Sequence, residues 1–202
     1  MAIDLADQQG LKAVTMRKTA QRLKVEAMSL YNHIANKEAL LDAMVEAVVS
    51  EVMLPDPNGE WREELRHWAF SMQAVLNRHP WATLLLMERI NIGPAMLSQI
   101  DAGLGCLVNA GFSLADADQA RNALTSHIYG FVLNEQNFPL EPGSYAEAAK
   151  TFLPNLPEDT YPYMRALALE VIEGRFSGLN DFSFGLDLIL DGLARKPARL
   201  ER

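Results

Sequence analysis

The segment VTMRKTAQRLKVEAMSLYNHIANKEALL, residues 14–41, decides the fold of this chain. It overlaps a basic cluster: residues 11–37 carry six lysines and arginines and a single acid, Glu26. The whole chain, by contrast, has a net charge of -8. A basic patch on an acidic chain is typical of a protein that touches a polyanion with one face. A solvated helix face would produce the same charge run, so charge alone leaves both interpretations open.

The composition narrows the class of protein. With 202 residues, 49% hydrophobic and 22% charged, the chain is predicted to be a soluble globular protein with one large or two small cores. The single cysteine, Cys106, excludes a disulfide within the chain and a cysteine-based zinc site. The sequence has no apolar run of the ~18 residues that a membrane span needs and no signal peptide pattern. We therefore expect a cytoplasmic protein without a membrane partner.

Proline and glycine separate segments whose apolar residues recur every three or four positions, which predicts an all-α fold. Thr15 and Asn36 are expected N-caps, because each side-chain oxygen can accept a free N–H of the first turn. Gly10 is expected to close the first helix, and Ser113 with Asp116 resembles a capping box. The predicted helices span residues 2–9, 16–23, 27–34, 37–53, 60–78, 81–90, 94–109, 114–137, 145–153, 158–174 and 180–195.

The stretch MLPDPNGEW, residues 53–61, interrupts the helical pattern and marks the predicted domain boundary. Residues 1–53 would form the smaller domain, with a net charge of -1, and residues 54–202 a larger helical domain with a net charge of -7. In the smaller domain, two short helices at 16–23 and 27–34 are joined by a tight turn and braced by a third. This arrangement predicts a helix-turn-helix, whose second helix enters the major groove of DNA.

The segment from Leu5 to Met44 resembles the TetR family of transcriptional regulators. The resemblance rests on T-x-R-x-x-A-x-x-L-x-V, followed in register by L-Y-x-H and N-K-x-x-L-L. Residues 109–138 and 182–193 look like the matching helices of the tetracycline-repressor branch. The resemblance implies a homodimer that binds a palindromic double-stranded DNA operator and a C-terminal domain that binds a small-molecule effector and forms a four-helix bundle with its mate. It leaves open whether the regulator represses or activates.

The resemblance also assigns DNA contacts within the motif. Asn32 is the best candidate for pairing with a base edge, because a carboxamide can bond bidentately to adenine, whereas Ala27 and Met28 can only contact a thymine methyl. Arg17 would reach the groove or its rim. Ser29 is also expected at the base edges. Phosphate contacts, which fix the register without reading sequence, are expected from Thr15, Lys18, Tyr31, His33 and Lys37. The full predicted set is Thr15, Arg17, Lys18, Ala27, Met28, Ser29, Tyr31, Asn32, His33 and Lys37.

Two apolar stripes at helical spacing are candidates for the dimer interface. Alone, such stripes are more often the core of one chain, but the resemblance favours an interface. The predicted interface residues are Leu124, Ile128, Phe131, Phe182, Leu186, Ile189 and Leu193.

The effector is expected to be a hydrophobic or planar molecule. Aligned with the tetracycline-repressor branch, the position of the magnesium-binding histidine is occupied here by Leu86 and that of a glutamate by Asn134. Leucine cannot bind Mg²⁺, so tetracycline–magnesium is not expected as the inducer, and we predict no metal and no cofactor. The lining that remains is rich in aromatic and methionine side chains, although a simple core is the alternative. The predicted ligand-binding residues are Met53, Trp68, Met72, Leu86, Arg89, Ile90, Gly103 and Asn134.

Two features depart from the family pattern. Lys24 stands where many relatives have a glycine in the left-handed conformation, at an expected cost of roughly 1 kcal/mol. The first helix is short, since relatives usually carry about ten further residues before it, which would reduce affinity for DNA. A helical carrier that has lost DNA binding is therefore the alternative function.

An enzyme is not expected. Glu64 and His67 have the spacing of one half of a di-iron site, but the sequence contains no second copy of the motif. The glycines at 103–111 follow no predicted strand, so they do not indicate a nucleotide-binding loop.

Overall fold

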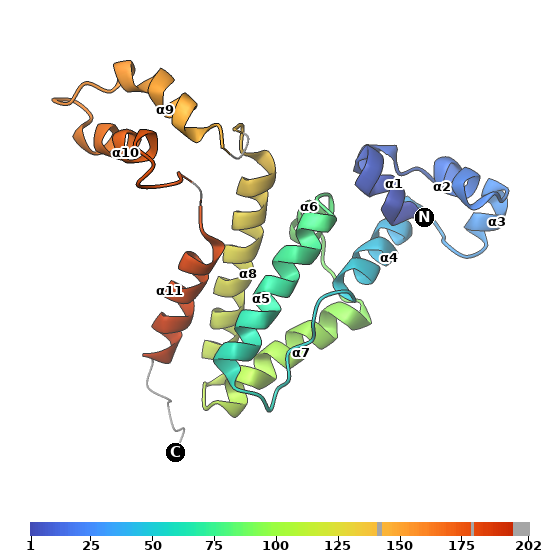
Figure 1. The fold of residues 1–202 in the computed structure, drawn as a ribbon. Coiled ribbons are helices and arrows are strands. Elements are labelled where there is room, and N and C mark those ends of the chain that lie inside the picture. The colour runs from blue at the N-terminus through green and yellow to red at the C-terminus, as the bar shows by residue number, and fades with distance from the viewer. Residues whose placement is uncertain (141–142, 179, 196–202) are drawn as a thin grey trace. The chain divides into compact units, whose positions relative to one another are not determined.

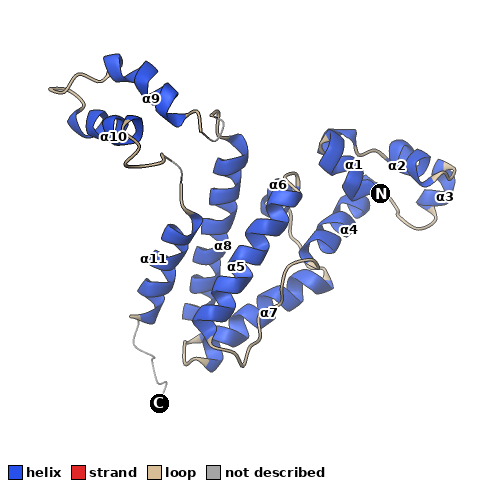
Figure 2. Ribbon diagram, in the orientation of Figure 1, coloured by secondary structure: helices blue, strands red, loops and turns tan. Residues whose placement is uncertain are grey.

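A computed structural model describes residues 1–140, 143–178 and 180–195, and every regular element among them is a helix (Figures 1 and 2). Two compact units divide the chain, one made of residues 1–136 with 184–202 and the other of residues 137–183. The α-helices are α1 (Ala2–Gln9), α2 (Met16–Leu23), α3 (Ala27–Tyr31), α4 (Lys37–Val49), α5 (Trp61–Arg78), α6 (Ala82–Glu88), α7 (Pro94–Asn109), α8 (Leu114–Asn137), α9 (Tyr145–Phe152), α10 (Pro162–Ile172) and α11 (Phe182–Ala194). Two 3₁₀ turns, η1 (Leu11–Ala13) and η2 (Leu153–Asn155), join their neighbours.

The expected helix caps form around the helix-turn-helix. Thr15 accepts the N–H of Lys18 at 3.2 Å and begins α2, and Asn36 accepts the N–H of Ala39 at 2.9 Å and begins α4. Gly10 ends α1 with a φ of 78° and a ψ of 162°, a positive-φ conformation outside the left-handed helical region that glycine adopts without a steric penalty. These three local signals fix where the first helices start and stop.

Some predicted ends are wrong by a few residues. We expected the second helix of the motif to reach residue 34, but α3 ends at Tyr31, because the N–H groups of His33 and Ile34 both bond to the carbonyl of Leu30 and the chain turns. The helix expected at 158–174 begins only at Pro162, after a turn in which Thr160 donates to the carbonyl of Pro157.

The larger unit has its core between α5, α7, α8 and α11, with α4 leading from the first three helices into it (Figure 1). Leu65, Leu76 and Leu107 are among its fully buried side chains. The residues predicted for the dimer interface lie on α8 and α11. Four of the seven, Leu124, Ile128, Phe182 and Leu186, are 0 to 5% exposed in a single chain and therefore belong to its own core.

The same helices also present apolar side chains that one chain leaves uncovered. Phe184 is 68% exposed and Leu188 is 60% exposed, and their spacing of four residues places them on one face of α11. The remaining predicted interface residues, Phe131, Ile189 and Leu193, are partly buried. The apolar residues of α11 therefore lie on two faces, and a single chain leaves the face of Phe184 and Leu188 largely exposed.

The smaller unit contains α9, η2 and α10, which pack on one another. Phe138 and Tyr145 stack with their ring centroids 5.6 Å apart, and Gly178 lies against the Tyr145 ring. None of the described residues from 137 to 181 is buried. The sequence did not predict that this segment forms a unit of its own.

Candidate DNA interface and effector domain

The helix-turn-helix is shaped by one residue with unusual backbone geometry. Lys24 ends α2 with a φ of 58° and a ψ of 39°, the left-handed conformation that was expected at this position. Its N–H bonds to the carbonyl of Gln21, and the next N–H, of Val25, bonds to Ala20. Ala20 is 1% exposed, so the small side chain lets α2 and α3 pack closely at this turn.

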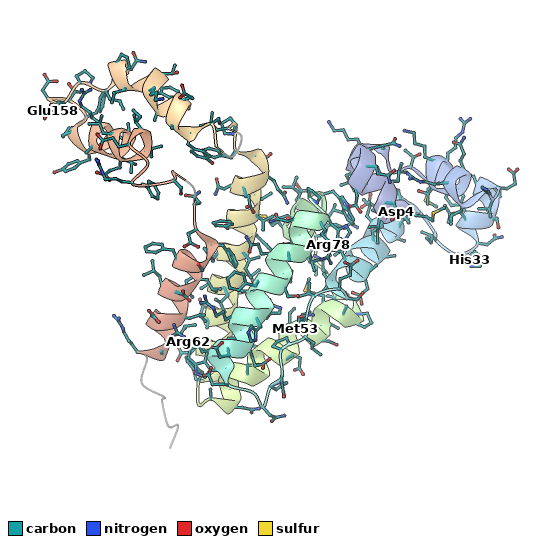
Figure 3. All side chains as sticks on the ribbon, viewed as in Figure 1. Asp4, His33, Met53, Arg62, Arg78 and Glu158 are labelled. Atoms are coloured by element: carbon teal, nitrogen blue, oxygen red, sulfur yellow. The ribbon has the colours of Figure 1, made fainter. Side chains whose placement is uncertain are left out.

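Almost all of the predicted DNA contacts lie on the surface. Ala27 is half-buried at the start of α3, whereas the other nine residues of the set are exposed. His33 is exposed at the end of the motif (Figure 3). Tyr31 is 45% exposed, so its ring is only partly packed. The predicted DNA-contacting side chains are therefore accessible to DNA.

The cations of the motif are unpaired within the part of the chain that the structure describes. Arg17, Lys18 and Lys37 form no ion pair there, and α3 itself carries no lysine or arginine. Positive charge therefore precedes and follows α3 in the sequence, at the start of α2 and at the start of α4. Such a surface can place cations on phosphates while α3 faces the base edges.

Helix α4 is held to α6 and α7 by three acids spaced four residues apart. The guanidinium of Arg89, at the end of α6, donates from Nε to Asp42 at 2.9 Å and forms an ion pair with Glu38. These two carboxylates raise the pKa of Arg89 above its usual value. Glu46 accepts the N–H of Ala95 in the first turn of α7, where a carboxylate is favourable.

A polar cluster joins α1 to the corner between α5 and α6. Asp7 Oδ1 accepts the indole N–H of Trp81 at 2.6 Å and lies 2.9 Å from Nδ1 of His79, while Nε2 of His79 lies 3.4 Å from Glu51. Arg78, which also binds Glu51, lowers the pKa of that carboxyl, and His79 adds to the shift. Trp81 and His79 are buried, so the cluster ties the first helix of the DNA-binding motif to the larger helical body.

The predicted effector residues fall into two groups. Trp68 and Met72 of α5, Leu86 of α6 and Gly103 of α7 are buried in the interior. The rest lie elsewhere: Met53 donates its N–H to Ser71, Arg89 is engaged by α4, Ile90 is 91% exposed, and Asn134 is exposed on α8.

Gln99 is a buried polar residue that the sequence analysis missed. It accepts the indole N–H of Trp68 at 3.0 Å and donates to the carbonyl of Val52 at 2.9 Å, so it links α5, α7 and the segment after α4. A signal was present, because Gln99 lies three, four and seven residues before Ala102, Gly103 and Cys106, which is the spacing of one helix face.

A cavity of about 470 Å³ lies at the loop before α5 and contains none of the predicted effector residues. Its lining consists of Pro57, Asn58, Gly59, Glu60, Trp61, Cys106, Asn109 and Ala110. Glu64, considered above as half of a di-iron site, accepts the N–H of Asp56 at 3.0 Å and so shapes this loop.

Comparison with known proteins decides the family. The family described as "Bacterial regulatory proteins, tetR family" matches residues 1–44, and "Tetracyclin repressor-like, C-terminal domain" matches residues 54–196. The chain belongs to the TetR family. It is 33% identical over 199 residues to the tetracycline repressor protein class A from transposon 1721 of Escherichia coli, which covers 96% of this chain and 88% of that protein.

Further relatives of this TetR-family protein come from actinomycetes. An HTH-type transcriptional regulator of Saccharopolyspora erythraea is 36% identical over 135 residues, which span 66% of this chain and 57% of that relative. The structure of the TetR family protein ActR of Streptomyces coelicolor, in complex with actinorhodin, matches with a TM-score of 0.79 at 28% identity over 96% of this chain and 92% of that one.

TetR-family membership makes the chain a ligand-responsive transcriptional regulator. Members of the family bind DNA operators as dimers and respond to small-molecule effectors, and the similar proteins are transcriptional regulators rather than enzymes. Among the described residues, no helix combines the length and the apolar character that crossing a membrane requires.

Proposed function

We propose that this TetR-family chain is a repressor that binds a palindromic operator as a homodimer and leaves it when a hydrophobic or planar ligand binds. The observation that carries the proposal is the exposed α2–α3 surface, with unpaired cations on both sides of α3. Arg17 reaches the groove or its rim, Asn32 pairs with a base edge, and Lys18 and Lys37 hold phosphates. A homodimer would place two α3 helices in successive major grooves, about 34–36 Å apart.

The two copies would meet through the exposed face of α11. Phe184 and Leu188 replace the buried residues of the predicted interface, while Ile189 and Leu193 remain candidates at its edge. Support comes from the exposure of two large apolar side chains one turn apart, which a single chain leaves in water.

The effector would bind among the buried side chains of α5, α6 and α7. Trp68 and Met72 supply an apolar lining, and Gln99 supplies a polar group that is already bonded to Trp68. A ligand that displaced the Trp68 indole would also disturb the bond from Gln99 to Val52, in the segment that follows α4. Binding would thereby favour a conformation in which α3 is placed differently from its place on DNA. Operator affinity would fall by the factor by which the ligand prefers that conformation to the DNA-binding one.

The test is a selection of genomic fragments by the purified protein, followed by sequencing of the retained DNA. The proposal predicts a palindrome whose half-sites lie one helical turn apart. Fragments without any shared motif would contradict it. Retention of small hydrophobic molecules in the absence of DNA retention would instead identify a helical carrier.

A further inference from the structure

The base-facing part of the motif is almost free of groups that recognise guanine. Residues 26–32, EAMSLYN, contain no lysine, arginine or glutamine, although four cations lie close by in sequence at positions 17, 18, 22 and 24. Guanine presents two acceptors in the major groove, and arginine or lysine is its usual partner. The cations of the motif therefore lie outside α3, and α3 itself offers uncharged side chains to the bases, preceded by one acid, Glu26.

Met28 dominates that neutral surface. Its side chain is 73% exposed, whereas Leu30, two residues later, is 6% exposed and fills the core of the motif. Met28 is the second residue of α3, in the turn that a recognition helix directs towards base edges. A thioether chain at this position contributes little to the packing of one chain, so its apolar surface is free for a partner.

The major groove contains one apolar group, the C5-methyl of thymine, and all other groups that distinguish the bases there are hydrogen-bond donors or acceptors. A methionine side chain is flexible and polarizable and has no strong donor, so it can contact the methyl but cannot satisfy guanine. We propose that Met28 reads a thymine methyl group in each operator half-site. This inference rests on the proposed function, because it assumes that α3 enters the major groove.

Neighbouring side chains fit the same assignment. Ala27 is half-buried beside Met28 and adds a second small apolar surface. Asn32, four residues after Met28, lies on the same side of the helix and is able to pair with adenine. A half-site contacted by Ala27, Met28 and Asn32 would be rich in A·T pairs at its centre. Arg17 would make any contact with guanine.

The test removes the methyl group and nothing else. Each thymine of an operator recovered by the genomic selection is replaced singly by uracil, which keeps every hydrogen-bonding group, and binding of the full chain is measured by fluorescence anisotropy. We expect one thymine in each half-site to matter, with about a four-fold loss of affinity for one replacement and about fifteen-fold for both, since a buried methyl is worth ~0.8 kcal/mol.

The Met28→Ala variant should bind the thymine and uracil operators equally well. Met87→Ala is the matched control, because Met87 is another exposed methionine, 56% exposed on α6, and it should keep the full uracil effect. Uracil sensitivity that survives in Met28→Ala, or a palindrome without a sensitive thymine, would overturn the inference and leave the proposed function standing. Failure to recover any palindrome would instead contradict the proposed function.

Discussion

The Asp7 cluster makes a prediction about how firmly α1 is held. Replacing Asp7 by alanine would leave the indole N–H of Trp81 without its partner, while His79 would keep only its longer contact with Glu51. A buried donor left without a partner costs about 1–3 kcal/mol. Since the Asp7 side chain is 26% exposed, water can replace part of the lost bonding, and we expect a loss of about 2 kcal/mol in the free energy of unfolding.

The assay is urea unfolding at one protein concentration, followed by tryptophan fluorescence. With a slope of about 2 kcal/mol per molar urea, the midpoint of Asp7→Ala should fall by about 1 M. Asp4→Ala is the matched control on the same helix, because Asp4 is half-exposed and pairs only with the terminal amine of Met1 among the described residues. Its midpoint should stay within error of the unmodified chain. Equal midpoints for the two variants would refute the reasoning.

Other parts of the structure give further predictions. Gly93→Ala should lower stability by about 1 kcal/mol, because a Cβ there would displace the Glu46 carboxylate from the N–H of Ala95, whereas Gly103→Ala meets no neighbouring atom and should differ from the unmodified chain only slightly in a thermal melt. Burial raises the pKa of the Cys106 thiol from 9.0 to about 11, so alkylation by iodoacetamide should stay slow up to pH 9 in the folded chain and become fast in urea. The thiol ionises at a lower pH in the unfolded chain than in the folded one. The contribution of Cys106 to the free energy of unfolding should therefore be complete below pH 9 and should fall as the pH rises towards 11. A free energy of unfolding that does not change over that range would contradict the burial argument.

The sequence predicted what depends on local chemistry. Thr15 and Asn36 cap helices by bonds to residues three positions later, and Lys24 forms the turn through its own backbone angles. Helix starts and the turn of the motif could therefore be predicted from residues close in sequence. The end of α3 was missed because both the longer and the shorter helix satisfy the same apolar pattern around Leu30.

Contacts between distant residues were not predictable in this way. Asp7 meets Trp81 across 74 positions, and Arg89 meets Asp42 across 47, and no local pattern pairs them. The face of α11 that a second copy would cover is not predictable from the sequence for another reason. Apolar residues occupy two faces of that helix, with Leu186 inside and Leu188 outside, so periodicity cannot say which face a second copy would cover.

The central claim is that unpaired cations beside α3 bind operator phosphates, and the salt dependence of binding tests it most directly. Affinity for the selected operator is measured from 50 to 300 mM salt for the unmodified chain, for Lys18→Ala with Lys37→Ala, and for Lys12→Ala, an exposed lysine assigned no contact. Each phosphate contact contributes about 0.9 to the logarithmic slope. Loss of two contacts in each of two copies should therefore flatten the slope by about 3.6, while Lys12→Ala keeps it. An unchanged slope in the double variant would contradict the account.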